Sequence, residues 1–246
     1  PYTNIPVTTE RGVKYIHDQA KTDDPFFLYF AYPSPHVPII PNDEFDGKSQ
    51  AGPYGDFVVE TDDSCGKLLQ ALKNSGQDKN TIVIFSADNG PAHYAYDRDE
   101  KFDHWSSQPF RGVKRDVYEG GHRVPFIVKW PGVTKAGTVS DALVSQIDIM
   151  ATIADFVGYK LPDDQAEDSH NLAPLLRGDV DAVRTTHIHN TTNTQYAIRH
   201  GDWVLIDAKE GYCKAHDEVE AWEEKHGYPV DDDQPAELFN LVEDIG

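Results

Sequence analysis

Residues 81–91 read TIVIFSADNGP. The first five of these residues are apolar or β-branched, which predicts a buried strand. Asp88 and Asn89 follow that strand directly, and a Gly-Pro pair then ends the extended run. Ligands of open α/β sheets bind at the carboxyl ends of strands, and carboxylate and amide oxygens are donors that Ca²⁺ or Mg²⁺ accepts. By itself the dipeptide fits either a metal site or an Asn-Gly turn with a capping aspartate.

Three further segments follow this strand in a fixed order. They read PFRGVK at 109–114, YEGGHRVP at 118–125 and IVKWPG at 127–132. Together with the Asp-Asn-Gly turn, this ordered set resembles the second half of the type I sulfatases, which are formylglycine-dependent sulfate-ester hydrolases of the alkaline phosphatase superfamily. The resemblance covers nearly all of this chain, but it covers only the later part of a sulfatase.

The resemblance implies an α/β fold in which a mixed alkaline phosphatase/sulfatase-like sheet is flanked by helices. We expect residues 1–183 to form the C-terminal part of the sulfatase α/β domain. Residues 184–246 are expected to form a small, incomplete antiparallel subdomain, because short alternating segments follow one another there. Apolar periodicity predicts helices over 11–20, 54–72 and 145–157, and an uninterrupted apolar run predicts a central strand over 26–31.

Several details of these helices follow from the same periodicity. In the helix over 54–72 the acidic residues are expected on a solvated face rather than in a metal site. Cys65 lies on its apolar stripe, which predicts a buried, unreactive thiol. In the helix over 145–157 the predicted core stripe is formed by Ile147, Met150, Ile153, Ala154 and Val157.

The resemblance also implies roles for individual side chains. Asp88 and Asn89 would bind Ca²⁺, or Mg²⁺ in its place, and Lys114 of the R-G-x-K segment would bind the sulfate. An ammonium close to the sulfate oxygens stabilises the charge that develops as the S–O bond breaks. His36 stands in PSPHVP, where sulfatases carry a histidine that contacts the sulfate. Arg111 and Arg123 are expected to hold neighbouring loops and buried carboxylates.

Residues 92–108 form a long polar and aromatic stretch, which predicts a functional loop. Aromatic rings and paired polar groups suit the surface of a sugar. We expect Asp103 and His104 to contact the sulfated substrate near the scissile ester, with ordinary surface-loop residues as the alternative. His187 and His189 share one face of a predicted strand and fit either a metal site or ordinary sheet residues.

The chain has 246 residues, of which 42 are acidic and 22 basic, so its formal charge is −20. Such a surface repels phosphates, which argues against a nucleic-acid partner. No apolar run reaches the roughly 18 residues that a membrane helix needs, so we expect no membrane span. Since a sulfate ester is itself an anion, the sulfatase interpretation requires cations placed locally at the site.

The nucleophile of the sulfatase family has no counterpart in this chain. Neither Cys65 nor Cys213 stands in the C-x-P-x-R or C-x-A-x-R context that the family converts to formylglycine. The expected partners are therefore a sulfated carbohydrate or other sulfate ester and the missing N-terminal segment of the same protein, which would carry formylglycine. We expect the 246-residue chain alone to be inactive, and the resemblance implies a secreted or periplasmic protein.

Two other functions remain open from the sequence. A phosphodiesterase or phosphonate monoester hydrolase of the same superfamily would share the sheet and parts of the metal site. A non-catalytic glycan-binding fragment would use the loop around His104 and Trp105.

Overall fold

The computed structural model describes the whole chain apart from residues 1–3, 193, 209–210, 213–216, 228–234 and 246. The chain divides into two compact units. Unit 1 comprises Pro1–Ile82 and Asp97–Ser106, and unit 2 comprises Val83–Tyr96 and Ser107–Gly246. The predicted boundary between residues 183 and 184 stays a prediction.

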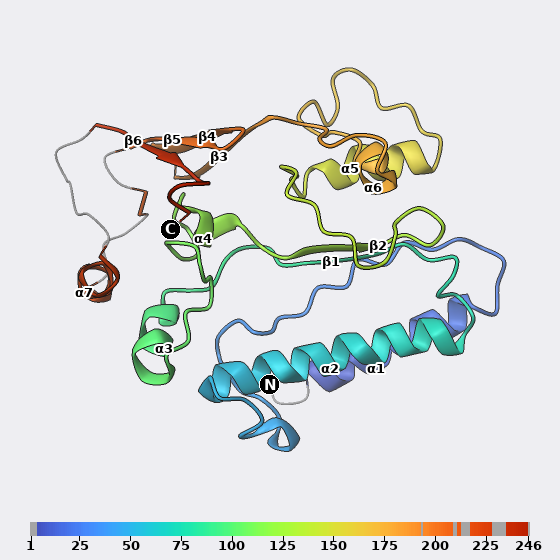
Figure 1. Ribbon diagram of the computed structural model, residues 1–246. Coiled ribbons are helices and arrows are strands. Elements are labelled where there is room, and N and C mark those ends of the chain that lie inside the picture. Colours follow the sequence, from blue (N-terminus) through green and yellow to red (C-terminus); the bar gives the residue numbers. More distant parts are fainter. Residues whose placement is uncertain (1–3, 193, 209–210, 213–216, 228–234, 246) are drawn as a thin grey trace. The chain divides into compact units, whose positions relative to one another are not determined.

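Two long helices lie side by side in unit 1 (Figure 1). They are α1, Asn4–Gln19, and α2, Gly52–Asn74. Periodicity predicted both, although α1 begins earlier than the predicted residue 11. A buried glycine permits their close approach, because a Cβ at Gly12 would lie 2.7 Å from Cδ2 of Leu68 in α2. No helix among the described residues combines the length and apolar character needed to cross a bilayer.

The start of α2 is tied to the preceding loop and to η1, Asp43–Phe45, by two buried carboxylates. Asp56 accepts hydrogen bonds from the backbone N–H groups of Gly47 at 2.9 Å and Ser49 at 2.7 Å. Glu60 accepts one from the backbone N–H of Asn42 at 2.9 Å. Burial alone would raise the pKa of the Asp56 carboxyl, but these backbone donors outweigh it and hold that pKa below its usual range.

The expectation of a wholly solvated acidic face on α2 is therefore wrong for part of that face. Asp62 and Asp63 are exposed as predicted, whereas Asp56 and Glu60 are buried. Cys65 is half-buried rather than buried, and burial raises the pKa of its thiol. Cys213 lies outside the described residues.

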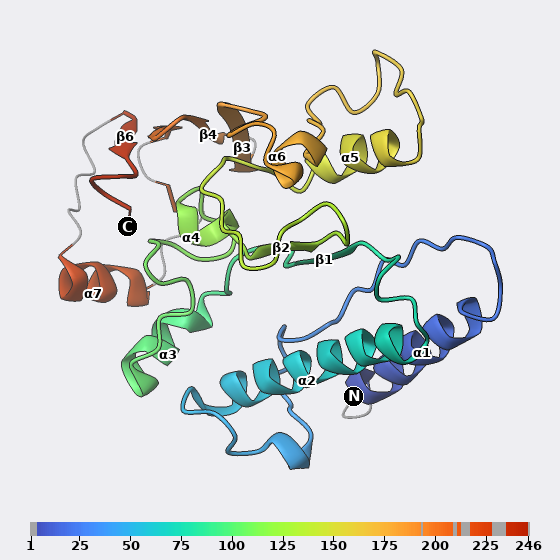
Figure 2. The same cartoon turned by 45° about the vertical axis from the view of Figure 1, so that its right-hand side comes forward.

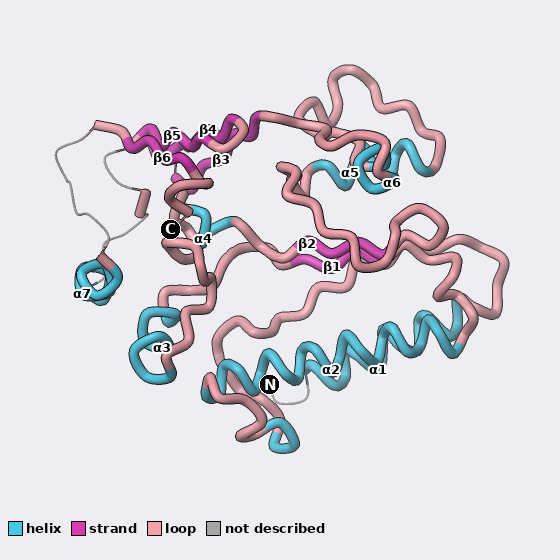
Figure 3. Tube along the Cα trace, viewed as in Figure 1, coloured by secondary structure: helices cyan, strands magenta, loops and turns pink. Residues whose placement is uncertain are grey.

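The strand predicted over 26–31 is absent, since residues 24–33 are loop (Figure 3). The side chains still alternate as in a strand, with Phe27 71% and Tyr29 82% exposed. A strand also requires a neighbour to complete its backbone hydrogen bonds. Within the described part of the chain no segment pairs with these residues, so the apolar run alone predicted the wrong element.

Unit 2 begins with the strand that carries the Asp-Asn pair. β1, Val83–Ser86, pairs antiparallel with β2, Phe126–Lys129, and Ile84 lies opposite Val128. The sequence predicted β1. The short helix α4, Glu119–His122, lies just before β2 in the chain and contains the Gly-Gly pair of the EGG segment.

A four-stranded antiparallel sheet follows in the order β3-β4-β5-β6 (Figure 1). Its strands are β3, Thr186–Thr192; β4, Gln195–His200; β5, Trp203–Asp207; and β6, Glu237–Asn240. Val204 and Ile206 are buried while their neighbours in β5 are exposed, as alternation requires. The sheet confirms the small antiparallel element predicted after residue 184. Helix α7, Asp217–His226, lies between β5 and β6 in sequence.

Helix α5, Asp148–Phe156, and the short helix α6, Ala173–Arg177, lie together in Figure 2. The predicted core stripe of α5 is largely wrong. Ala154 is buried as predicted, but Met150 is 54% exposed and Val157 65% exposed, and the polar Asp148 is buried in their place. The polar face turns inward because Asp148 pairs with the buried Arg184, whose Nε donates to it at 3.2 Å.

Candidate metal and anion site

The loop after β1 presents two oxygen-bearing side chains. Asp88 is exposed and Asn89 is half-buried. The Asn89 amide donates from Nδ2 to the Gly90 carbonyl at 2.8 Å, which leaves its Oδ1 as an available acceptor. Among the described residues no hydrogen-bond donor or cation engages the Asp88 carboxylate. Both side chains therefore keep oxygen lone pairs for a cation.

Gly90 fixes this loop against the EGG segment. Its backbone N–H donates to the Gly121 carbonyl at 2.9 Å. A Cβ at Gly90 would lie only 1.8 Å from the carbonyl oxygen of Gly120. Since both partners are backbone, no side-chain movement could relieve that clash. Position 90 therefore requires glycine. The segment that Gly90 approaches is the Gly120-Gly121 pair of α4.

Lys114 is hydrogen-bonded through its backbone to the loop that follows β1. Its backbone N–H donates to the Pro91 carbonyl at 2.7 Å. The residue lies in a turn closed by two hydrogen bonds, from the Asp116 N–H to the Val113 carbonyl at 2.9 Å and from the Val113 N–H to Asp116 Oδ2 at 2.7 Å. The structure thus brings the loop of the predicted metal ligands and the loop of the predicted sulfate-binding lysine together.

The donor chemistry fits part of a calcium site. Ca²⁺ takes about six to eight oxygen ligands, and Asp88 with Asn89 supplies hard oxygens from adjacent positions. Over the described ranges no group of three or more His, Cys, Asp or Glu side chains could hold a metal. The remaining ligands would have to come from water, substrate or protein outside those ranges.

The other predicted site residues lie in unit 1. His36 is exposed, and its Nδ1 lies 2.8 Å from the Val37 carbonyl, so a neutral ring carries its proton on Nδ1 and its lone pair on Nε2. Asp103 is exposed and His104 half-buried. The roles of these three residues stay predictions.

The long loop predicted over 92–108 is partly helical, which corrects that expectation. Helix α3 runs Tyr94–Phe102 and contains an i,i+4 ion pair between Lys101 and Asp97 at 3.0 Å. Asp103 follows the helix in the left-handed region, with φ at 52°. Aspartate tolerates that region better than most residues, so the chain turns at Asp103 before it reaches His104.

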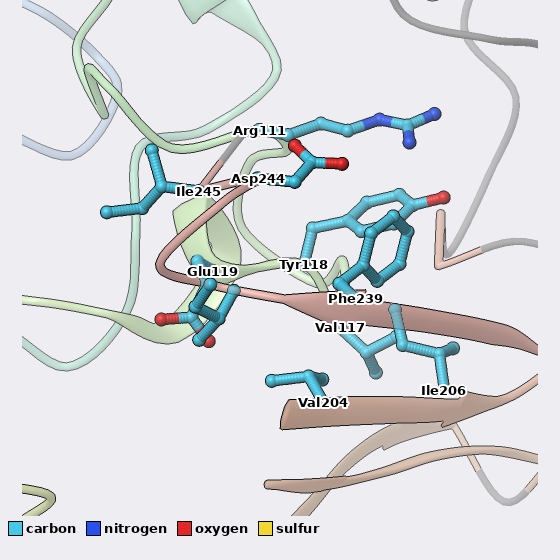
Figure 4. A pocket seen from close by; sticks show the side chains of 10 residues that line it. Arg111, Val117, Tyr118, Glu119, Val204, Ile206, Phe239, Asp244 and Ile245 are labelled. Carbon is cyan, nitrogen blue, oxygen red and sulfur yellow. The ribbon is translucent and has the colours of Figure 1, made fainter. Parts of the chain in front are cut away.

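Arg111 is buried and precedes the Lys114 turn in the chain. Its Nε donates to the Tyr212 hydroxyl at 2.9 Å, and its guanidinium pairs with Glu223 of α7. The guanidinium carbon lies 4.3 Å from the centre of the Tyr118 ring, and both side chains are drawn in Figure 4. Arg123 pairs with Glu119 at 3.0 Å. The expectation that both arginines hold buried carboxylates is confirmed.

A small cavity lies beside this arginine (Figure 4). Its volume is about 20 Å³, and apolar side chains such as Val117, Val204 and Phe239 contribute to its wall. A space of this size holds about one water molecule. It cannot accept a sugar, so it belongs to the packing between the sheet and the loop of residues 111–119.

Three histidines gather where α4 meets β3. The ring centres of His122 and His189 are 3.9 Å apart, and those of His189 and His187 are 6.0 Å apart. Nε2 of both His122 and His189 lies near the Val117 carbonyl, at 3.2 Å and 3.0 Å. His187 and His189 lie in β3 as predicted, and over the described ranges no group of three or more His, Cys, Asp or Glu could hold a metal.

This cluster makes the fold sensitive to acid. Burial, with smaller contributions from His189 and His187, lowers the pKa of His122 from 6.5 to about 3. The unfolded chain therefore takes up the proton first as pH falls. The contribution of His122 to stability is complete above pH 6.5 and is lost progressively as pH drops toward 3.

We expect the free energy of unfolding to fall below pH 6.5 by less than about 1.4 kcal/mol per pH unit from His122, because its side chain keeps 32% exposure. Urea unfolding at pH 7 and pH 5 measures this loss. His122→Gln should reduce the difference between the two pH values, and the exposed His200→Gln should not. An unchanged pH dependence in His122→Gln would contradict the assignment.

The sequence matches two described protein families. The Sulfatase family model matches residues 2–159, and the model for N-sulphoglucosamine sulphohydrolase, C-terminal, matches residues 112–244. The N-acetylgalactosamine-6-O-sulfatase of Bacteroides thetaiotaomicron is 33% identical over 90% of this chain and 42% of its own length. The N-acetylgalactosamine-6-sulfatase of Mus musculus is 40% identical over 69% of this chain and 32% of its own length.

Solved structures show the same likeness. A protein from work on glycosaminoglycan metabolism by Bacteroides thetaiotaomicron matches 99% of this chain and 49% of its own chain, with a TM-score of 0.82 and 30% identity. A sulfatase from Pseudoalteromonas sp. matches 99% of this chain and 47% of its own, with a TM-score of 0.80 and 27% identity. The likenesses confirm the predicted fold class. The chain spans less than half the length of these relatives.

Proposed function

The chain belongs to the sulfatase family, and on that basis we propose that the whole protein hydrolyses sulfate esters of carbohydrates. One observation carries the proposal: the Asp88-Asn89 loop and the Lys114 turn are joined through the Pro91 carbonyl at 2.7 Å. This hydrogen bond joins the backbone of the loop with the hard oxygen donors to the backbone of the turn that carries Lys114, which supports a shared pocket for a tetrahedral anion. Sulfated sugars are the first substrates to test, because two relatives are named for the 6-sulfate of N-acetylgalactosamine.

The chain's own residues have distinct tasks in the proposed mechanism. Asp88 and Asn89 would hold Ca²⁺, or Mg²⁺ in its place. When bound, the ion polarises the sulfate oxygens as a Lewis acid. Lys114 would place its ammonium against the same oxygens and stabilise the charge that grows during S–O cleavage. The formylglycine nucleophile would come from protein outside this chain.

The remaining predicted residues belong to the same proposal. His36 would contact the sulfate through Nε2, and Asp103 with His104 would contact the sugar near the scissile ester. The formal charge of −20 repels a sulfated substrate at long range. The bound ion and Lys114 would attract it at short range, where the more distant carboxylates are screened by salt. A secreted or periplasmic location, implied by the family resemblance, completes the proposal.

A comparison of the whole protein with its Lys114→Ala variant tests the function. The substrates are a 6-sulfated N-acetylgalactosamine, an aryl sulfate and a phosphodiester. We expect turnover of sulfate esters and a loss of about 10²- to 10³-fold in kcat/KM for Lys114→Ala, as for removal of one charge-stabilising donor. The exposed Lys135→Ala should match the unaltered protein. The 246-residue chain alone should show no turnover.

Three outcomes would contradict the proposal. Cleavage of the phosphodiester but of no sulfate ester would indicate a phosphodiesterase or phosphonate monoester hydrolase. Binding of the sulfated sugar without hydrolysis would indicate a glycan-binding protein. Robust turnover by the 246-residue chain would refute the dependence on a nucleophile outside it.

A further inference from the structure

Arg115 occupies a position where glycine is favoured. It is the third residue of the turn from Val113 to Asp116, and its φ is 82°. Turns with a positive φ at that position take glycine or asparagine in most proteins, because a side chain there is strained. Backbone strain of this kind persists where the surrounding structure holds it, and it gathers at functional sites.

The turn is held firmly in that strained shape. Asp116 is 6% exposed, and its Oδ2 accepts the Val113 N–H at 2.7 Å. Gly112 precedes the turn with φ at 85°, where an added Cβ would lie 2.9 Å from Cβ of Tyr118. Both flanks are therefore buried and fixed. Lys114 and Arg115 are the two central residues of the turn, and they are half-buried and exposed, respectively.

Arg115 is also an uncompensated charge. It is exposed, and within the described part of the chain neither Arg115 nor Lys114 forms an ion pair. This is notable in a chain with 42 acidic residues and 22 basic ones. The turn is joined to the Asp88-Asn89 loop by the Lys114–Pro91 hydrogen bond. Two adjacent cationic residues thus lie on the turn that is joined to the loop of the proposed metal ligands.

We propose that Arg115 determines specificity, by favouring substrates that carry a second anionic group beside the scissile sulfate ester. The inference rests on the function proposed above. A monosulfated sugar brings one negative charge, which Lys114 and the bound cation already balance. A planar guanidinium binds a further sulfate or a carboxylate through two parallel hydrogen bonds. The substrate class is therefore a polyanionic sulfated carbohydrate.

The test compares two sugars cleaved at the same sulfate, one monosulfated and one with an additional sulfate or carboxylate on the neighbouring position. We expect the whole protein to prefer the doubly charged sugar. In Arg115→Gly and Arg115→Asn the ratio of the two kcat/KM values should fall about tenfold, mainly through KM, because a charged hydrogen-bonding partner is lost. Both replacements suit a positive φ, so the turn should keep its shape.

Two controls separate charge from structure. Arg115→Lys keeps the charge but loses the planar pair of donors, so it should retain only part of the preference. Lys135→Ala removes an exposed charge outside this turn and should leave the ratio unchanged. An unaltered ratio in Arg115→Gly would overturn the specificity role while sulfate-ester turnover by the same preparations left the proposed function standing. A whole protein that cleaves neither sugar would overturn both proposals together.

Discussion

Replacing Asp88 with alanine in the whole protein should lower kcat/KM on sulfate esters by at least about 10³-fold, since a metal ion supplies several kcal/mol of charge stabilisation and each 1.36 kcal/mol is tenfold in rate. Of the two proposed ligands, Asp88 and Asn89, only Asp88 carries a charge. Among the described residues no further cluster of His, Cys, Asp or Glu could hold the ion in place of Asp88.

The same substitution has a readout that does not depend on activity. A ligand that binds only the folded state stabilises it by about 2.7 kcal/mol at a concentration one hundred times its Kd. Added Ca²⁺ should therefore raise the Tm of the whole protein, and Asp88→Ala should abolish that rise. Asp141→Ala, which removes an exposed carboxylate from unit 2, is the matched control and should keep it. A calcium-dependent Tm that survives Asp88→Ala would contradict the proposed ligand role.

Gly90→Ala should damage both stability and catalysis. The added Cβ would lie 1.8 Å from the Gly120 carbonyl oxygen, and two backbone segments must separate to admit it. That separation breaks the 2.9 Å hydrogen bond from Gly90 to Gly121 and disturbs the neighbouring Pro91–Lys114 contact. Overpacking costs about 1–3 kcal/mol, and a 1 Å misplacement of catalytic groups costs about 10²-fold in rate.

Chemical denaturation and kcat/KM of the same preparation measure the two effects of Gly90→Ala. Gly66→Ala is the matched control, because a Cβ at Gly66 meets nothing within 4 Å and the residue lies inside α2. It should stabilise the protein by about 0.5–1 kcal/mol, as alanine does in helices. A Gly90→Ala variant with unaltered stability and activity would show that the two loops do not meet as described.

Local patterns predicted the elements whose stability is largely local. The helix α2 carries a long apolar periodicity, and β1 is a short apolar run that ends in turn residues. Both were found with small errors in their bounds. The antiparallel strands β3, β4 and β5 were predicted for the same reason, since alternation with turn residues between the runs marks hairpins.

The errors arose where distant residues decide the outcome. Residues 26–31 have a strand's alternation but no pairing partner among the described residues, and pairing is a nonlocal property. In α5 the buried ion pair of Asp148 with Arg184 determines which face turns inward. Arg184 lies 36 residues further along the chain, so a periodicity confined to one helix could not show it.

In the candidate site, too, sequence motifs indicated some residues, whereas contacts between residues far apart in the chain were not predicted. The ordered segments singled out Asp88, Asn89 and Lys114, and the structure joins their two loops by a backbone hydrogen bond, while the roles of the three side chains stay predictions. The sequence predicted that Arg111 holds a buried carboxylate, but it did not identify which one. The partner, Glu223, lies 112 residues away. No short-range signal marks that pair. The positive φ of Arg115 is a property of the folded turn and has no signal in the sequence.

A crystal structure of the whole protein with Ca²⁺ and a bound sulfate tests the central claim most directly. We expect the ion within about 2.3–2.6 Å of oxygens from both Asp88 and Asn89, and the ammonium of Lys114 within hydrogen-bonding distance of the sulfate. A calcium ion bound elsewhere, or a Lys114 side chain directed away from the anion, would contradict the account.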